Sequence, residues 1–519
     1  MALGAQGRNA ERLAITPRDF RPADVARGER LLAGLFEFGG ETMDLGAGGD
    51  PWSGATPSRQ FAAALHGFGW IRDLVAVGEP GAREALRLWL EWRRAFAKPG
   101  GFAWTPRLLE RRVFNLACAA GELTLLASDA ECAALVEALT TGARRLVGER
   151  DEPARALERV AVAALAAAAS PSKSGGALQE RCLKQLARLI PQAVLRDGVH
   201  ASRSPERGLE LLFDLLALDD VLSQRGAPAP LEMSRAIDRL SAATRFFALD
   251  DGRLATFHGG EGSTRARVAA ALSLDPDAGP PSRSAPYGLY HRVEGGGVQV
   301  MADVGRQPEA AWSEEACSQL GALAVLGDGR RLVLGSSASA KAELDAARRG
   351  PAGGSCLQLA EEWPGIDLRR EQLTGGPREV KVERRQHEHE IWLEVAHAGW
   401  TGLSATRRLY LDTRAGDLRG EDALEPEGRG RRDAVELTIR FHLAPDVAAS
   451  VAADGRSALL RPAGGRGWRL RSDAEGLRLA PGVAFDDGAP RTTQVLMLTG
   501  LATPKDGARV RWRLSRDEA

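Results

Sequence analysis

Tyrosine and cysteine are scarce in this sequence. Its 519 residues include three tyrosines, all after position 286, and five cysteines. The cysteines are odd in number, widely spaced and without CxxC pairs, which argues against a disulfide framework or a thiolate zinc site. His387 and His389 share a predicted strand face but lack a third ligand at readable spacing. We therefore expect reduced, mostly buried thiols, no metal and no cofactor.

An excess of either charge and a long apolar run are also missing. Lys and Arg together number 69, as do Asp and Glu, so no global field attracts nucleic acid or an anionic membrane, and any anion must bind locally. No stretch approaches the roughly 18 apolar residues of a membrane span, and the first residues lack the apolar core of a secretory signal. We expect no nucleic-acid partner, no membrane span and a cytoplasmic location, or a periplasmic one if the start codon is misassigned. The oligomeric state is open.

A helical pattern occupies the first half of the chain. Between about residues 58 and 273 the apolar residues recur every three to four positions, and Ala, Leu, Arg and Glu dominate. This period and this composition are typical of amphipathic helices. Breaks rich in glycine and proline, such as AKPGGFAWTP and SPSKSGG, separate segments of helical length. We predict an array or toroid of helical hairpins, preceded by an N-terminal extension at residues 1–57.

A strand pattern occupies the second half. The linker LDPDAGPPSRSAP, residues 274–286, is rich in proline, glycine and serine, which places the domain boundary there. Beyond it, apolar and polar residues alternate in AVELTIRFHL and ARVRWRL, the period of a half-buried strand. Turn signals such as GDG and DDG separate similar runs. Residues 287–519 are therefore predicted to form an antiparallel β-sandwich.

Several short motifs occur in the order found in the heparinase II/III-like polysaccharide lyases. RDGVHASRSPERGLELLFDLLALDD, residues 196–220, is similar to that family's Asp-Gly-Gly-His loop, Ser-Pro turn and following helix, and is the most specific match. FAAALHGFGWIRDL, ERRVFN, GLYHRVEGGGVQVMADVG and EVAHAGW resemble further family segments. This resemblance spans most of the chain. It implies an incomplete α/α toroid followed by a β-sandwich, and an acidic, uronic-acid polysaccharide as the substrate.

The resemblance also implies cleavage by β-elimination. This chemistry requires a group that neutralises the substrate carboxylate, a base that removes the neighbouring carbon proton, and an acid that protonates the leaving oxygen. His200, in a loop flanked by glycine, and Tyr290, on the first predicted sandwich strand, are the candidates for catalysis. A histidine that caps the next helix and an ordinary strand aromatic are the structural alternatives.

Five further residues are candidates for substrate binding. Arg203 and Arg207 follow the glycine-flanked loop and suit an acidic sugar, because a guanidinium binds a carboxylate well. Asn115, in ERRVFN, offers an amide beside two arginines, or else bridges two helices. His66 and His397 either face a sugar-binding groove or lie at the edge of the core. Their positions match the family segments quoted above.

The sequence departs from the family where its catalytic residues stand. Glu206, Arg207 and Gly208 occupy the place of a Tyr-His pair, and Gln319 occupies the place of a histidine. Two functions are therefore open, a polysaccharide lyase and a glycan-binding relative that has lost the acid and the base. An inverting glycoside hydrolase is a third, since paired carboxylates can activate a water and acidic residues are dense between positions 206 and 220.

Overall fold

The computed structural model describes residues 13, 15–150, 153–170, 173–342, 346–360, 366–367, 372–373, 376–377, 379–400, 402–428 and 433–517. The chain divides into two compact units, and each is described by itself. Unit 1 comprises residues 1–193 and 210–238, and unit 2 comprises residues 194–209 and 239–519. The first twelve residues, on which the expectation about a secretory signal rests, lie outside the described residues.

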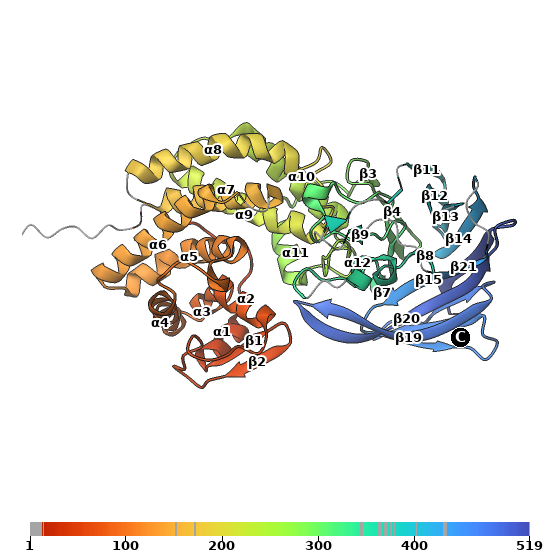
Figure 1. Ribbon diagram of the computed structural model, residues 1–519, viewed down its shortest axis with the longest axis horizontal. Coiled ribbons are helices and arrows are strands. Elements are labelled where there is room, and N and C mark those ends of the chain that lie inside the picture. The colour runs from red at the N-terminus through yellow and green to blue at the C-terminus, as the bar shows by residue number, and fades with distance from the viewer. Residues whose placement is uncertain are drawn as a thin grey trace, which may run out of the picture. The chain divides into compact units, whose positions relative to one another are not determined.

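Unit 1 is predominantly helical (Figure 1). It contains α1 (Val25–Leu32), α2 (Arg59–Gly67), α3 (Ile71–Ala76), α4 (Glu79–Ala95), α5 (Pro106–Leu126), α6 (Asp129–Gly148), α7 (Ala156–Ala169), α8 (Lys173–Ala193), most of α9 (Pro205–Gln224) and the first half of α10 (Leu231–Phe247). A small antiparallel hairpin of β1 (Leu35–Phe38) and β2 (Glu41–Asp44) follows α1. The residues predicted as an N-terminal extension thus include a helix and a hairpin.

Polar caps and small residues determine where these helices begin and how closely they pack. The Ser58 hydroxyl accepts a backbone N–H at the start of α2, and Ser128 forms a capping box with Glu131 at the start of α6. In α1, a Cβ atom at Gly28 would lie 2.1 Å from the carbonyl oxygen of Asp73. Only glycine therefore permits the close approach of α1 to α3. The alanine-rich α7 is buried along almost its entire length.

Unit 2 contains two large antiparallel sheets. In order across the first sheet, the strands are β11 (Val380–His387), β12 (Glu390–Trp400), β13 (Leu403–Asp412), β14 (Asp417–Pro426), β21 (Ala508–Arg516), β18 (Trp468–Ser472), β17 (Ser457–Pro462) and β16 (Val447–Val451). In the second they are β19 (Gly476–Asp486), β20 (Ala489–Ala502), β15 (Val435–Leu443), β7 (Arg330–Leu334), β6 (Leu323–Gly327), β5 (Val298–Asp303), β4 (Tyr290–Gly295) and β3 (Ser284–Ala285), with β8 (Leu357–Leu359) paired to β15. The short elements β9 (Ile366–Asp367), β10 (Gln372–Leu373), α11 (Arg265–Leu272) and α12 (Ala346–Arg349) complete the unit.

The two large sheets share one hydrophobic core, as in a β-sandwich. The alternation predicted in AVELTIRFHL is confirmed in β15, where Val435, Ile439 and Phe441 are buried. Trp512, on β21, packs edge-on against Phe441 with ring centroids 5.1 Å apart. A helical first half followed by antiparallel sheets is therefore the observed fold class, as the sequence predicts.

The linker at 274–286 begins just after α11, contains β3, and lies within unit 2. Most of its residues are exposed. Its role as a domain boundary stays a prediction. None of the described helices is long and apolar enough to cross a membrane.

Candidate functional site

His200 lies in the loop before α9, and its side chain is buried. Its ring Nδ1 lies 2.7 Å from the Ser202 hydroxyl oxygen and accepts the Ser202 backbone N–H at 3.1 Å. The imidazole packs edge-on against Trp312, with ring centroids 5.4 Å apart. The guanidinium carbon of Arg207 lies 5.8 Å from the centroid of the same indole. The structure thus brings His200 and Arg207 together around Trp312.

Arg203 follows in the same loop and is also buried. Its φ of +61° is in the left-handed region, where residues other than glycine are uncommon. A guanidinium carries five N–H donors, and all five of those of Arg203 have acceptors in unit 2. The acceptors are the carbonyl oxygens of Gly288, Leu289, Gly305 and Arg306 and the carboxylate of Asp303. Arg203 therefore holds the loop against β4 and the end of β5, and contact with a substrate would require breaking one of these bonds.

Tyr290, at the start of β4, is 0% exposed. Its hydroxyl donates to the backbone carbonyl oxygen of Arg203 at 2.7 Å. The rings of Phe247 and Phe257 lie 4.9 and 5.2 Å from the Tyr290 ring. Burial raises the pKa of the Tyr290 phenol well above its ordinary value. The hydroxyl is thus enclosed by protein and already bonded, whereas a proton donor must reach the leaving oxygen of a substrate.

His258 is a buried histidine that the sequence analysis did not single out. Its Nε2 bonds to the Asp303 carboxylate at 3.1 Å, and its Nδ1 accepts the backbone N–H of Cys317 at 3.1 Å. Since Nδ1 accepts, the proton lies on Nε2. Burial lowers the pKa of His258, although the hydrogen bond to Asp303 opposes this effect. Both ring nitrogens are therefore hydrogen-bonded to groups of the protein, and neither is available as a base.

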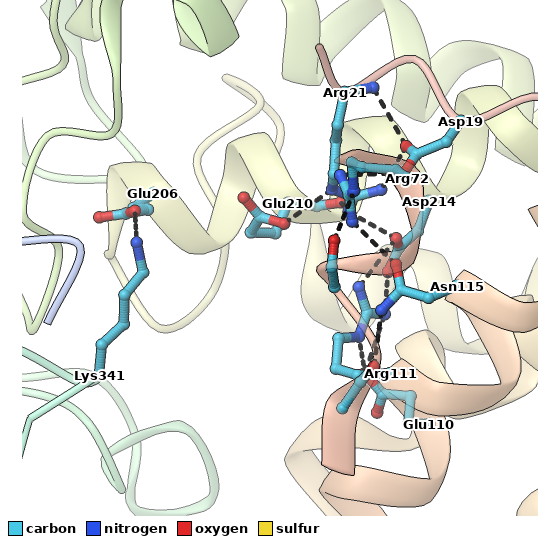
Figure 2. A network of polar contacts seen from close by, with 12 residues as sticks. Asp19, Arg21, Arg72, Glu110, Arg111, Asn115, Glu206, Glu210, Asp214 and Lys341 are labelled. Atoms are coloured by element: carbon cyan, nitrogen blue, oxygen red, sulfur yellow. Dashed lines mark hydrogen bonds and ion pairs between the residues drawn. The ribbon is translucent and has the colours of Figure 1, made fainter. Parts of the chain in front are cut away.

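Glu206, at the start of α9, is buried and belongs to a second polar network in unit 2, of which Figure 2 shows the ion pair with Lys341. Its carboxylate accepts the backbone N–H of Glu261 at 2.7 Å and lies 2.9 Å from the Lys341 ammonium. The Glu261 carboxylate accepts the Ser339 hydroxyl and the Gly488 N–H. Burial raises the pKa of Glu261 and, against it, the charge of Lys341 lowers it. The network joins four segments that are distant in sequence.

Asn115, on α5 in unit 1, bridges two structural elements. Its amide nitrogen donates to the Gly67 carbonyl oxygen at 2.8 Å, and its amide oxygen accepts from Arg72 at 2.8 Å. The side chain is buried. These contacts match the structural alternative given for Asn115. Its role toward a substrate carboxylate stays a prediction.

His66, at the end of α2, lies in an aromatic cluster of unit 1. Its Nδ1 accepts the indole N–H of Trp92 at 2.9 Å, and the Phe96 ring packs edge-on 4.8 Å away. Burial, with the charge of Arg112, lowers the pKa of His66 to about 4. The histidine is therefore neutral near pH 7 and is an acceptor within the cluster.

Asp214, on α9, lies at the centre of a polar network in unit 1 (Figure 2). Its carboxylate contacts the guanidinium of Arg21 at 2.7 Å and that of Arg111 at 2.5 Å. Arg21 also bonds to the Glu210 carboxylate at 3.0 Å, and Arg111 lies 3.0 Å from Glu110. Glu206, Glu210 and Asp214 are thus held in ion pairs, whereas an inverting hydrolase needs two carboxyl groups that face a substrate and a water.

Two further positions named in the sequence analysis, His397 and Gln319, belong to unit 2. His397, on β12, lies with its ring 5.0 Å from that of Trp400, and burial lowers its pKa to about 4. Gln319 donates its amide hydrogens to the carbonyl oxygens of Arg348 at 2.8 Å and Gly350 at 3.1 Å. An amide has no titratable proton, so Gln319 is a structural donor where a base was expected from the resemblance.

The candidates divide between the two units. Two belong to unit 1, and the others belong to unit 2. The unit 1 residues are His66 and Asn115; the unit 2 residues are His200, Arg203, Arg207, Tyr290 and His397. In the part of the chain that the structure describes, no group of three or more His, Cys, Asp or Glu side chains is arranged to hold a metal ion.

A family model described as "Heparinase II/III-like, C-terminal" matches residues 277–513. Among curated proteins, FtsZ-localized protein C of Caulobacter vibrioides is 44% identical over 524 aligned positions, which cover 98% of this chain and 91% of that protein. Both findings agree with the resemblance drawn from the motifs.

Solved structures agree on the fold. A heparinase III structure superimposes with a TM-score of 0.73 at 12% identity, covering 99% of this chain and 88% of that one. The heparan sulfate lyase HepC of Pedobacter heparinus gives a TM-score of 0.56 at 14% identity, covering 98% and 85%. At such low identity these matches establish the fold alone, an α/α toroid followed by a β-sandwich, as predicted.

Proposed function

Because this chain belongs to the heparinase II/III-like family, we propose that it keeps the lyase fold but acts by binding, and that it localises with FtsZ. One observation carries the first part. The Tyr290 hydroxyl, the catalytic acid expected from the sequence, is 0% exposed and donates to the carbonyl oxygen of Arg203. An acid or base in β-elimination must touch the substrate. Two further positions support the same conclusion, since His258 has both ring nitrogens bonded and Gln319 replaces a histidine.

The second part rests on the curated relative. FtsZ-localized protein C is 44% identical to this chain over 98% of its length. Its name attributes to it a location, not a reaction. We transfer that location to this chain because the identity extends across both halves of the fold. The cytoplasmic location expected from the sequence remains part of this proposal.

Co-sedimentation tests the proposed localisation. The purified full chain is centrifuged with FtsZ polymers assembled with GTP, and in parallel with unassembled FtsZ. We expect the chain in the pellet only when polymers are present. A fluorescent fusion of the full chain should then form a band where FtsZ assembles in cells. A chain that stays in the supernatant together with a diffuse fusion would contradict the proposal.

A second candidate function, elimination on an acidic polysaccharide, is favoured by one specific contact. Tyr287 is 51% exposed, and its hydroxyl accepts a hydrogen bond from Arg196 at 3.3 Å. The backbone N–H groups of Tyr287 and Gly288 donate to Asp197, which fixes this segment. An exposed phenol beside a guanidinium has the chemistry of a proton donor. If the chain is a lyase that uses Tyr287 as the proton donor, Tyr287→Phe abolishes formation of an unsaturated product. Tyr410→Phe is the control and does not abolish it.

A further inference from the structure

Unit 2 contains a pocket of about 390 Å³ outside the residues considered above for catalysis. Its wall is formed by the segment after α10, by β7 and the serine-containing loop that follows it, by the turn before β16, and by the β19–β20 hairpin. The volume lies in the range of small-molecule sites. Five arginines line it: Arg253, Arg265, Arg330, Arg331 and Arg491.

Arg331 lies deepest among these arginines, with 9% of its side chain exposed. It forms two hydrogen bonds to the Asp251 carboxylate, at 2.7 and 3.0 Å. The pKa of Arg331 is nevertheless lowered, chiefly by burial and also by the charges of Arg253 and Arg265. The guanidinium groups of Arg253 and Arg265 thus lie near enough to Arg331 for their charges to act on it.

Four acidic residues, Asp251, Glu261, Asp446 and Asp486, line the pocket with the five arginines, so the lining has an excess of one positive charge. Asp486 is paired with Arg253 at 2.9 Å. The Glu261 carboxylate bonds to the Ser339 hydroxyl and the Gly488 N–H. Burial raises the pKa of Glu261, and the charge of Lys341 opposes this shift. Asp446 is then the remaining acidic side chain of the wall.

Arg330 and Arg491 supply the exposed donors of the pocket. Both side chains are exposed, and neither has a hydrogen-bond or ion-pair partner among the residues that the structure describes. Ser336 and Ser337, which are buried, lie in the same wall. The Ser337 hydroxyl donates to the Gly353 carbonyl oxygen, so the exposed guanidinium groups are the donors that can form short, charge-assisted bonds to phosphate and sulfate oxygens. A wall of this composition is suited to an oxyanion.

We propose that this pocket binds the phosphate or sulfate group of a small molecule, a site separate from any interaction with FtsZ. Arg330 and Arg491 contact the oxyanion, and Arg331 supplies a fixed positive charge beneath it. Because the chain as a whole is neutral, the attraction is local to the pocket.

Titration calorimetry of the full chain with inorganic phosphate at low ionic strength tests the site. We expect saturable binding to one site. Arg491→Gln and Arg330→Gln should each weaken it about tenfold, the effect of losing one charge-assisted contact. Arg471→Gln is the matched control, because Arg471 is an exposed arginine of β18 outside the pocket and, among the described residues, has no ion-pair partner. This control should bind phosphate as the unchanged chain does.

Four further ligands identify what the oxyanion belongs to. Inorganic sulfate and a sulfated monosaccharide should compete with phosphate if the ligand is a sulfated sugar, and a phosphorylated monosaccharide should do so if it is a sugar phosphate. Either result supports the site. Binding of glucuronate alone would overturn the assignment to a tetrahedral oxyanion. Absence of saturable binding, or an equal loss in Arg471→Gln, would overturn the site itself. Co-sedimentation with FtsZ is unaffected by any of these outcomes.

Discussion

The phenolic hydroxyl of Tyr290 lies 2.7 Å from the backbone carbonyl oxygen of Arg203 and donates to it. The Arg203 guanidinium in turn donates to the two residues before β4 and to Asp303 at the end of β5. The two residues that the motifs favour for acid catalysis and sugar binding are therefore partners of one another. Their contact fixes the loop before α9, and this structural use is the basis of the proposal that the chain binds without cleaving.

Tyr290→Phe tests the structural role of that hydroxyl. Removing it leaves the buried Arg203 carbonyl oxygen without this donor, so we expect the free energy of unfolding to fall by about 1 to 3 kcal/mol. Urea unfolding followed by circular dichroism measures the change. Tyr410→Phe is the control, because its hydroxyl bonds to Glu390 on an exposed surface and its loss should have little effect. Equal stability of the two variants would contradict the role given to Tyr290.

Asp214→Asn tests the ion-pair network of unit 1. The substitution removes the negative charge between the buried Arg21 and the partly exposed Arg111, and leaves the Arg21 guanidinium poorly compensated. Breaking a buried pair in this way costs about 3 to 5 kcal/mol. We expect a matching decrease in the free energy of unfolding, measured by the helical circular dichroism signal in urea. Asp220→Asn, on the same helix, should change it by much less, because the hydrogen-bond partner of Asp220 among the described residues is an exposed glutamine, Gln224, at 2.7 Å.

His442 makes the stability of the sandwich depend on pH. Its Nε2 donates to the Ala352 carbonyl oxygen at 2.9 Å, and burial lowers its pKa to about 4. An unfolded histidine has a pKa of about 6.5, so between these values the unfolded chain binds more protons. The stabilisation that comes from keeping His442 neutral is therefore fully present above about pH 6.5. It is lost as the pH falls toward 4, and the free energy of unfolding then decreases by up to about 1.4 kcal/mol per pH unit.

The variant His442→Gln should make the pH dependence less steep. We expect the slope of the unfolding free energy against pH to decrease between about pH 4 and 6.5. The decrease should be up to about 1.4 kcal/mol per pH unit, which corresponds to one bound proton. His387→Gln is the control, since His387 lies exposed on β11. Were both variants to keep the slope of the unchanged chain, the assignment to His442 would be wrong.

Limited proteolysis tests the predicted boundary at 274–286. The segment between α11 and β3 is largely exposed and rich in proline and glycine, which favours cleavage there. We expect two stable fragments, one helical and one β-rich by circular dichroism. Mass spectrometry locates the cut. A first stable cut between residues 194 and 209, or near 239, would instead follow the division into compact units.

The fold was predictable because its signals are local. The alternation at Val435, Ile439 and Phe441 predicts which face of β15 is buried, and the structure confirms it. The hairpin at 35–44 was not predicted, because each of its strands has only four residues and gives little periodicity. Tertiary contacts then decide its conformation.

The site was less predictable because its partners are distant in sequence. The motif identified the loop around Arg203, but the acceptors of Arg203 lie 85 to 103 residues later. His258 was missed because a single histidine in FHGGEG does not indicate its hydrogen-bond partner. That partner, Asp303, lies 45 residues later in the chain. The adjacent glycines and the positive φ of His258 are consistent with a tight loop, and FHGGEG was the one available signal.

Ultraviolet absorbance of the full chain with acidic polysaccharides tests the central claim most directly. Heparan sulfate, chondroitin, alginate and bacterial acidic capsules are each incubated with the protein, and the unsaturated product of β-elimination is followed over time, with an active heparinase III as the positive control. We predict no increase in absorbance with any of these polysaccharides, and no change in the length of the polysaccharide chains. A steady increase on any one of them, abolished by Tyr287→Phe or by Tyr290→Phe, would contradict the account and establish a lyase.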